Sequence, residues 1–302
     1  MAERHGAVPP LGASQAPPNR LYVGDNLPIL QAIGAELGGG VDLIYIDPPF
    51  GSQSDRVLRA GGATTTAYSD RWTGGLPDYL DMLLPRLRLL RELLTPTGAL
   101  YVHLDPTAAH YVKVLLDEIF GPECFQREIV WRIGWISGYK SVVRNWARNH
   151  DTILFYTRDP REFTFHKEYV AHPAGYARRG GGEGPGRPIE DVWNANAAEA
   201  ALTGADSLDS IQIKSFSREK TGYETQKNES LLRRVIAASS NPGELVADFF
   251  CGSGTTLVAA ERLGRRWLGC DSSPAAIGVT RARLLGLAER AAFEVAGSVP
   301  EQ

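Results

Sequence analysis

The sequence is poor in cysteine, has no long apolar run and carries little net charge. Its three cysteines, Cys124, Cys251 and Cys270, form no obvious pair and no metal-like spacing, which predicts no metal site and fits a reducing cytoplasm. No apolar run reaches the length of a membrane span, and the N-terminus lacks the apolar segment of a secretory signal, so no membrane partner is expected. The net charge of −3 excludes a uniformly basic protein, so a nucleic-acid surface must be a local patch.

What the sequence does contain is a regular alternation of strand-like and helix-like segments. Apolar runs at residues 41–46 and 99–105 are each followed by a segment with helical spacing, at residues 77–94 and 107–119. This order is typical of an α/β fold, with a mostly parallel sheet that carries helices on its faces. The length of 302 residues allows one large domain with a smaller insert.

The strand at residues 41–46 ends abruptly in Asp47-Pro48-Pro49-Phe50. In an open α/β sheet, ligands bind at the carboxyl ends of the strands. The two prolines stiffen the turn and have no N–H, so the Asp47 carboxylate and the Pro48 carbonyl form a rigid pair of acceptors beside the Phe50 ring. Such a set suits a planar group with an exocyclic amine, although the stretch taken alone also fits an ordinary turn.

Polar residues at other strand ends are further candidates for the site. Asp25 follows the first strand, where it is either a turn residue or helix N-cap, or a cofactor contact. His103 and Asp105 end the strand at residues 99–105, where they line the site or have structural roles. Residues 51–72 form a polar stretch, and a long segment without structure beside a site is usually a lid or a binding loop, so one of these is expected here.

A second anchor lies far downstream, where a strand ends at Asp248 and a glycine-rich turn leads into a helix. Gly252 and Gly254 allow the backbone to approach a ligand closely. Asp271 ends the next strand about 20 residues further on, the spacing at which a carboxylate meets a ribose diol. A dinucleotide would require a third glycine at Leu257 and would meet the negative charge of Asp248, which disfavours a nicotinamide oxidoreductase. S-adenosylmethionine, with a ribose, an adenine and a zwitterionic tail, suits these groups better.

The middle of the chain is locally basic. Residues 126–190 contain 11 Lys and Arg against 7 Asp and Glu, with aromatic residues interleaved. This composition fits phosphate contact and base stacking, although a solvated loop region is the alternative. Beyond residue 159 the periodicity is weak, which indicates a small irregular insert at residues 159–222. The predicted DNA-binding residues are Lys140, Arg144, Arg148, Arg178 and Arg179.

With Asp47-Pro48-Pro49-Phe50 ahead of Phe250-Cys251-Gly252-Ser253-Gly254, the chain resembles the bacterial site-specific amino-group DNA methyltransferases of the β arrangement. In that family the catalytic motif precedes the motif that binds S-adenosylmethionine, and the target-recognition segment lies between them. The match covers residues 20–158 and 220–285. The resemblance implies a Rossmann-like fold with a circularly permuted motif order.

The resemblance also implies a set of site residues. Gly24-Asp25-Asn26 is similar to the family's strand-end acid near the cofactor adenine, and the segment from Gly222 to Lys227 is similar to the one that borders the methionine end. Asn228 and Phe249 depart from the family, which usually has proline at both positions. The implied catalytic residues are Asp47, Pro48, Pro49 and Phe50, and the implied cofactor residues are Asp25, Asp47, Gln226, Lys227, Asp248, Phe250, Cys251, Gly252, Ser253, Gly254, Thr255 and Asp271.

These matches divide the chain into expected parts. The parts are a disordered tail at residues 1–18, a catalytic half at 19–158, the recognition insert at 159–222, a cofactor-binding half at 223–290 and a C-terminal tail at 291–302.

The resemblance implies direct transfer of a methyl group from S-adenosylmethionine to N6 of a flipped adenine in double-stranded DNA. Adenine is favoured because an Asp at the first motif position goes mostly with adenine in this family. Cytosine N4, an RNA or protein amide, and an inactive DNA-binding subunit stay open as alternatives. A homodimer and a partner restriction endonuclease are further implications, and the recognition sequence cannot be derived.

Overall fold

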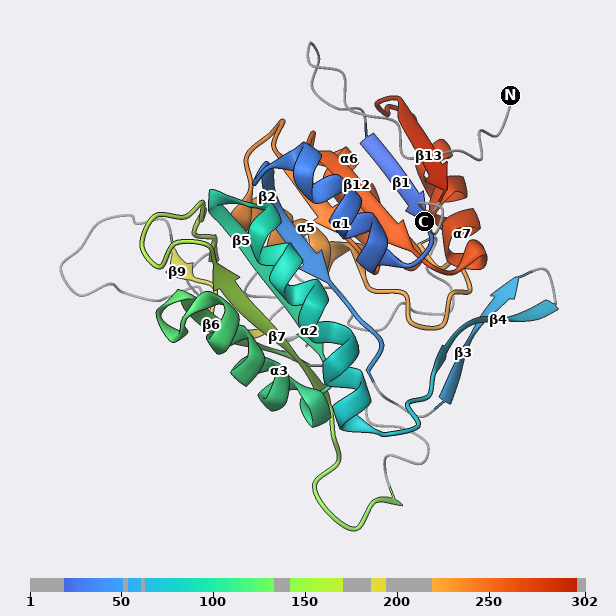
Figure 1. Cartoon of the computed structure of the whole chain (residues 1–302), viewed down its shortest axis with the longest axis horizontal. Coiled ribbons are helices and arrows are strands. Elements are labelled where there is room, and N and C mark those ends of the chain that lie inside the picture. Colours follow the sequence, from blue (N-terminus) through green and yellow to red (C-terminus); the bar gives the residue numbers. More distant parts are fainter. Residues whose placement is uncertain are drawn as a thin grey trace.

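The computed structural model describes residues 19–50, 54–60, 63–132, 142–170, 186–193 and 219–297. Its centre is a nine-stranded sheet with the order β10-β6-β7-β5-β2-β11-β12-β1-β13 (Figure 1). The strands are β1 Asn19–Val23, β2 Val41–Ile46, β5 Leu94–Leu104, β6 Phe125–Arg132, β7 His150–Thr157, β10 Val192–Trp193, β11 Leu245–Asp248, β12 Arg266–Asp271 and β13 Phe293–Gly297.

The sheet is mostly parallel, as predicted, and one strand is reversed. Strand β7 runs antiparallel to both of its neighbours, β5 and β6, while the other pairs in the sheet are parallel. Strand β2 lies between β5 and β11. Because β2, β11, β12 and β1 are parallel, their carboxyl ends lie at the same edge of the sheet.

Helices cover both faces of the sheet (Figure 1). One layer contains α1 Asn26–Leu37, α2 Leu76–Leu93 and α3 Pro106–Phe120, and the other contains α5 Glu229–Ser239, α6 Thr255–Arg262 and α7 Pro274–Leu285. Because side chains alternate along a strand, Ile44 and Ile46 of β2 pack under the first layer, and Leu43 and Tyr45 pack under the second. This double burial explains why β2 reads as a continuous apolar run.

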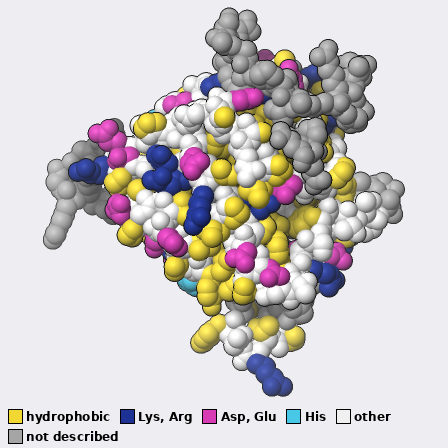
Figure 2. Space-filling model, viewed as in Figure 1, with side chains coloured by type: hydrophobic (Ala, Val, Ile, Leu, Met, Phe, Trp, Pro, Cys, Tyr) yellow, Lys and Arg dark blue, Asp and Glu magenta, His cyan; other side chains and the backbone are white. Residues whose placement is uncertain are grey.

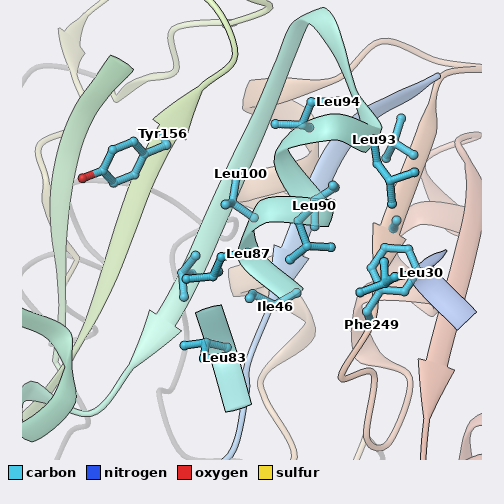
Figure 3. Packing of buried hydrophobic residues seen from close by; sticks show 14 of the residues in the cluster. Leu30, Ile46, Leu83, Leu87, Leu90, Leu93, Leu94, Leu100, Tyr156 and Phe249 are labelled. Carbon is cyan, nitrogen blue, oxygen red and sulfur yellow. The ribbon is translucent and has the colours of Figure 1, made fainter. Parts of the chain in front are cut away.

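Leucines of α2 form the centre of the first apolar layer (Figure 3). Leu83, Leu87 and Leu90 are fully buried, in one cluster with Ile46 and Leu100 of the sheet. Full burial of a leucine side chain contributes about 1.5–3 kcal/mol. Among the described residues, no helix is long and apolar enough to span a membrane.

The segment after Phe50 differs from the predicted long segment without structure. Its described residues form an antiparallel hairpin of β3 Ser54–Ala60 and β4 Ala63–Asp70. The prediction was wrong because the β-branched and aromatic residues of these strands, such as Val57, Thr65 and Tyr68, favour extended structure even though the segment as a whole is polar.

Two other regions also differ from the sequence-based division. Strand β13 pairs with β1 within the expected C-terminal tail, and Phe293 packs on Trp267 with 5.4 Å between ring centroids. In the expected insert, β10 adds to the central sheet beside β6, and β8 Tyr169–Val170 pairs with β9 Arg187–Pro188. Short strands of this kind give too few residues for a periodicity to be recognised. Residues 1–18 lie outside the described part of the chain.

The hairpin is bound to a segment from the other end of the chain. The Arg59 amide donates to the carbonyl of Gly222 at 3.0 Å, and the Glu224 amide donates to the carbonyl of Val57 at 3.2 Å. Gly222 has φ +87°, and a Cβ placed there would lie 1.9 Å from the carbonyl oxygen of Arg59. Only glycine therefore permits this approach.

We predict that Gly222→Ala separates the hairpin from the segment at residues 222–224. Gly243→Ala is the matched control, because Gly243 also has a positive φ, of +82°, but has no atom within 4 Å of the added Cβ. Backbone strain should lower the unfolding free energy of both variants by about 1–2 kcal/mol. Gly222→Ala should lose more than this, because its new Cβ also clashes with the carbonyl of Arg59. Hydrogen exchange at the Arg59 amide should accelerate in Gly222→Ala alone; equal protection in both variants would contradict the docking.

Candidate active site

A pocket of about 270 Å³ lies at the edge of the sheet where β1, β2, β11 and β12 end. The structure brings to it residues that the sequence predicted from five separate stretches of the chain. The predicted residues that line it are Asp25, Asp47, Pro48, Pro49, Phe50, Lys227, Asp248, Phe250, Cys251, Gly252, Ser253, Thr255 and Asp271.

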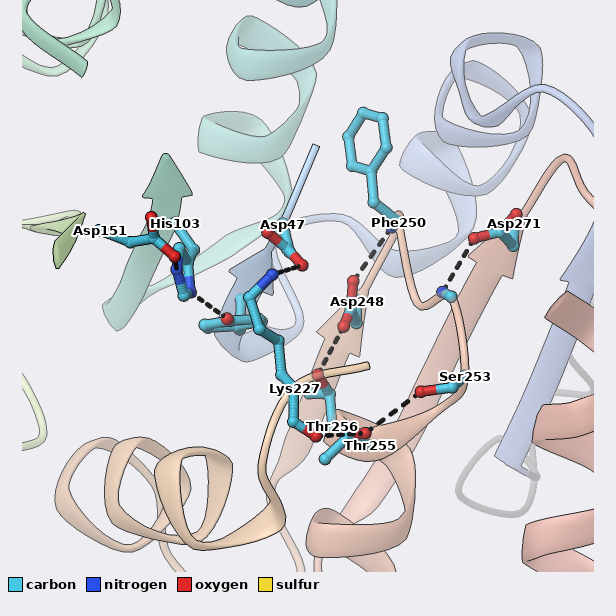
Figure 4. Close-up of polar contacts among 12 residues, drawn as sticks. Asp47, His103, Asp151, Lys227, Asp248, Phe250, Ser253, Thr255, Thr256 and Asp271 are labelled. Carbon is cyan, nitrogen blue, oxygen red and sulfur yellow. Dashed lines mark hydrogen bonds and ion pairs between the residues drawn. The ribbon is translucent and has the colours of Figure 1, made fainter. Parts of the chain in front are cut away.

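The Asp47 carboxylate has one oxygen at this pocket that is free to accept a hydrogen bond. Its Oδ2 atom is paired with the Lys227 ammonium group (Figure 4). Its Oδ1 atom is buried and has no hydrogen-bond partner in the described part of the chain. The Phe50 ring lies beside the same ion pair, with Lys227 Nζ 5.0 Å from the ring centroid. A buried acceptor without a partner is costly, so this atom is suited to a ligand that donates a hydrogen bond.

The glycine-rich turn after β11 is held by Asp271. The amide of Gly252 donates to Asp271 Oδ2 at 2.8 Å, and the amide of Ser273 donates to Asp271 Oδ1 at 2.8 Å. Burial raises the pKa of Asp271, against the effect of these two hydrogen bonds. The carboxylate thus fixes the turn while it faces the pocket, and each oxygen keeps a lone pair for a ligand hydroxyl group.

Gly254 does not line the pocket, although the sequence placed it in the cofactor site. It has φ +75°, and a Cβ there would lie 2.5 Å from Cγ2 of Thr280 in α7. Its role is therefore to let the turn pack closely on α7. Arg283 of α7, which the sequence reasoning missed, donates to the Ser253 carbonyl at 2.8 Å and to Thr255 Oγ1 at 2.9 Å.

Asp25 combines both roles that the sequence left open. Its Oδ1 atom caps α1 by accepting from the Leu27 amide at 3.0 Å, and the residue also lines the pocket. Arg86, a second residue that sequence reasoning missed, donates to Asp25 Oδ1 at 2.6 Å and to Asn26 Oδ1 at 2.6 Å. The Asn26 amide group donates in turn to the Phe249 carbonyl at 2.6 Å. A charged residue inside the leucine face of α2 was the signal for this connection.

Gln226 acts on its own loop and does not line the pocket. Its Oε1 atom accepts from the Thr221 amide at 2.9 Å, and its Nε2 atom donates to the Glu219 carbonyl at 2.7 Å. Asn228 then caps α5 by accepting from the Ser230 amide at 2.8 Å. The cap stabilises the start of α5 by a hydrogen bond, where the resembling family usually has the fixed φ of proline.

The predicted DNA-binding residues fall into three groups. Arg144 is exposed, next to Trp146, whose side chain is 97% exposed. The guanidinium group of Arg148 is instead paired with Asp151 and, at 2.8 Å, with Asp105. Lys140, Arg178 and Arg179 lie outside the described residues. On the face in Figure 2, basic and acidic side chains of the described residues are intermixed, in line with the small net charge.

The family model for DNA methylases with N6 or N4 specificity matches residues 41–281. The type II methyltransferase M.EcaI of Enterobacter cloacae is 32% identical over 85% of this chain and 67% of its own length. The DNA adenine methyltransferase YhdJ of Escherichia coli K12 is 26% identical over 82% of this chain and 76% of its own. The structure is also similar to that of a putative DNA modification methylase of Thermus thermophilus complexed with S-adenosyl-L-methionine. There the TM-score is 0.54 at 20% identity, over 94% of this chain and all of that one.

The fold and the pocket thus define a Rossmann-like α/β methyltransferase. This chain belongs to the DNA methylase family of N6 and N4 amino-methyltransferases. The predicted resemblance to the β arrangement is confirmed, and the cofactor of the family is S-adenosylmethionine. The pocket fits that cofactor, because carboxylates of Asp47, Asp248 and Asp271 face a space that suits a sulfonium cation and a ribose better than a pyrophosphate.

Asp248 gives a prediction about stability. Burial raises the pKa of its carboxyl group to about 7, and the hydrogen bonds from Thr256 and from the Phe250 amide only partly oppose this. The folded state then binds a proton between about pH 4 and pH 7 that the unfolded state has lost, so this group's stabilisation falls as the pH rises through that window. Asp248→Asn, which is neutral at every pH, should lack this fall.

The measurement is urea unfolding of both proteins, without cofactor, at pH 5 and pH 8. The stability of the wild-type protein relative to Asp248→Asn should be a few kcal/mol lower at pH 8 than at pH 5. Parallel pH dependences of the two proteins would show that Asp248 does not change its protonation in this range.

Proposed function

We propose that the protein transfers a methyl group from S-adenosylmethionine to adenine N6 in double-stranded DNA. The observation that carries this proposal is the buried Oδ1 atom of Asp47, which has no partner among the described residues and lies beside the Phe50 ring. An aspartate at the first position of the motif favours adenine by resemblance, and the relative YhdJ is named a DNA adenine methyltransferase.

The chemistry required of the chain is limited. The lone pair of an aromatic amine is delocalised into the ring, which makes the nitrogen a poor nucleophile. Asp47 Oδ1 and the Pro48 carbonyl accept the amine hydrogens and localise the lone pair as the nitrogen becomes tetrahedral. These hydrogen bonds strengthen in the transition state, which is the requirement for catalysis.

Lys227 and Phe50 complete the arrangement around Asp47. Lys227 occupies Oδ2 and leaves Oδ1 for the substrate amine. Phe50 stacks on the face of a base that has been flipped out of the duplex. When bound, S-adenosylmethionine would supply the electrophilic methyl group; Asp271 would hold its ribose, and the turn from Phe250 to Thr255 would border it. Positioning of the two reactants accounts for much of the rate.

Cytosine N4 is the second candidate, because both amines fit the same acceptors and the family model includes both specificities. An RNA or protein amide is less favoured, since the relatives named above are DNA methyltransferases. An inactive subunit is disfavoured, because the catalytic and cofactor motifs meet in one pocket. The homodimer, the partner endonuclease and the cytoplasmic location stay predictions.

DNA contact is proposed for part of the basic segment only. Arg144 is exposed and stands beside the exposed Trp146, a pairing of charge and ring that suits a phosphate and a base. Arg148 is not proposed, because its guanidinium group is occupied by two carboxylates. Lys140, Arg178 and Arg179 stay predictions.

The test is nucleoside mass spectrometry of duplex DNA incubated with the protein and S-adenosylmethionine. N6-methyladenine should form, and Asp47→Ala should lower kcat by at least about 10²-fold, because the variant lacks the acceptor for the amine. Asp81→Ala, at an exposed aspartate of α2, is the control and should retain full activity.

N4-methylcytosine as the product would keep the mechanism and overturn the proposed base. Methylation by Asp47→Ala at the wild-type rate would overturn the role of Asp47. Absence of any methylated nucleoside on a mixed-sequence DNA that contains the target would overturn the proposed reaction, provided that calorimetry shows bound S-adenosylmethionine.

A further inference from the structure

We propose that Tyr45, His103 and Asp151 form a buried positioning chain that fixes the plane of the Phe50 ring. These three residues take no part in the mechanism above. The inference rests on the proposed function, in which Phe50 stacks on the flipped base, and it assigns the control of that stacking to residues on β2, β5 and β7.

The positioning chain is continuous, and Figure 4 shows His103 and Asp151 to one side of Asp47. The Tyr45 hydroxyl group lies 2.7 Å from His103 Nδ1, and His103 Nε2 lies 3.2 Å from Asp151 Oδ2. Asp151 is paired in turn with Arg148. The side chain of His103 is fully buried, and Tyr45 is 1% exposed.

Tyr45 and Asp151, at the two ends of the positioning chain, differ in whether they can donate a proton to the imidazole. Burial raises the pKa of the Tyr45 hydroxyl group well above its ordinary value, so Tyr45 keeps its proton. Burial also acts to raise the pKa of Asp151, but the hydrogen bond and charge of His103, and then Lys227 and Arg148, lower it overall, so Asp151 stays an acceptor. The ionised Asp151 carboxylate has no proton to donate, so His103 Nε2 carries the proton of the hydrogen bond between them.

The orientation of the imidazole is passed to Phe50 by ring contact. The rings of Phe50 and His103 are stacked, with centroids 5.9 Å apart and planes 30° apart. Trp131 holds the imidazole edge-on, at 5.1 Å and 85°. Two hydrogen bonds and edge contacts with Tyr45 and Trp131 thus fix the imidazole, and the Phe50 ring contacts both that imidazole and the Lys227 ammonium group.

Packing alone does not require such a chain. Tyr101 is the partner of Tyr45 across β2 and β5, and it stacks on Phe155 at 4.4 Å and 8° with a single side-chain bond to Ser239. Burying a charged group and an imidazole costs more free energy than burying aromatic rings of similar volume. His103, where this added cost falls, is the residue whose ring stacks on Phe50, and Asp151 is its hydrogen-bond partner.

The test compares Tyr45→Phe with Tyr101→Phe. Each variant removes one hydroxyl group from a buried tyrosine whose hydrogen bond is 2.7 Å long, so both should lose similar stability. Tyr45→Phe should lower kcat at least about 10-fold with the Kd for S-adenosylmethionine unchanged, whereas Tyr101→Phe should stay within about twofold of the wild-type kcat. Equal kcat values for the two variants would overturn the proposal.

Two further readouts separate positioning from general destabilisation. In a Phe50→Leu background, Tyr45→Phe should have little additional effect on kcat, because its effect passes through the Phe50 ring; multiplicative losses would contradict this. Nitrogen NMR of the wild-type protein should show a proton on His103 Nε2, and an unprotonated Nε2 would contradict the proton assignment.

A crystal structure of Tyr45→Phe decides the inference even if the wild-type protein methylates no DNA, a result that would overturn the proposed function only. A changed angle between the rings of Phe50 and His103 supports the positioning chain. An unchanged angle overturns it.

Discussion

The ion pair between Lys227 and Asp47 is the contact on which the site depends, because it joins two motifs 180 residues apart. Asp47 ends a strand of the sheet, while Lys227 lies just before α5 in the segment that Gln226 shapes. The carbonyl of Lys227 accepts from Thr255 Oγ1 at 3.2 Å, so the same residue also holds the start of α6. A single lysine thereby fixes the Asp47 carboxylate, the Phe50 ring and the glycine-rich turn with respect to one another.

Sheet geometry explains why the order of these motifs along the chain does not matter. Strands β2 and β11 are parallel neighbours although about 200 residues separate them. Parallel neighbours present their carboxyl ends at one edge, so Asp47 and Asp248 meet whichever strand is synthesised first. The reversed strand β7 brings His150 and Asp151 to the same end of the sheet by its amino end, which is how a residue from the basic middle segment comes to lie below the catalytic motif.

The sequence alone was sufficient to predict pocket residues where a strand is buried on both faces and is followed by, or ends in, an aspartate. Strands β2, β11 and β12 have that pattern, and Asp47, Asp248 and Asp271 line the pocket as predicted. The sequence was insufficient to predict the contacts of a side chain whose partners are distant along the chain. Arg86 and Arg283 hold the pocket through partners on other elements, and Gly254 serves helix packing. The leucine face of α2 marks Arg86 as unusual, but no local pattern identifies the partners of these residues. The hairpin was missed because its outer edge is paired with residues 222–224, which follow it by more than 160 positions.

The attachment of that hairpin has a consequence for how the protein binds its two substrates. Tyr68 and Arg56 of the hairpin line the same pocket as Lys227, while the outer strand is bonded to the backbone three to five residues before Lys227. Moving the hairpin to admit a bulky nucleic acid therefore disturbs the backbone that holds the cofactor side of the pocket. By thermodynamic linkage, a bound cofactor must then resist that movement to the same degree that the movement weakens cofactor binding. The binding of the two substrates is thus coupled through one short stretch of backbone pairing.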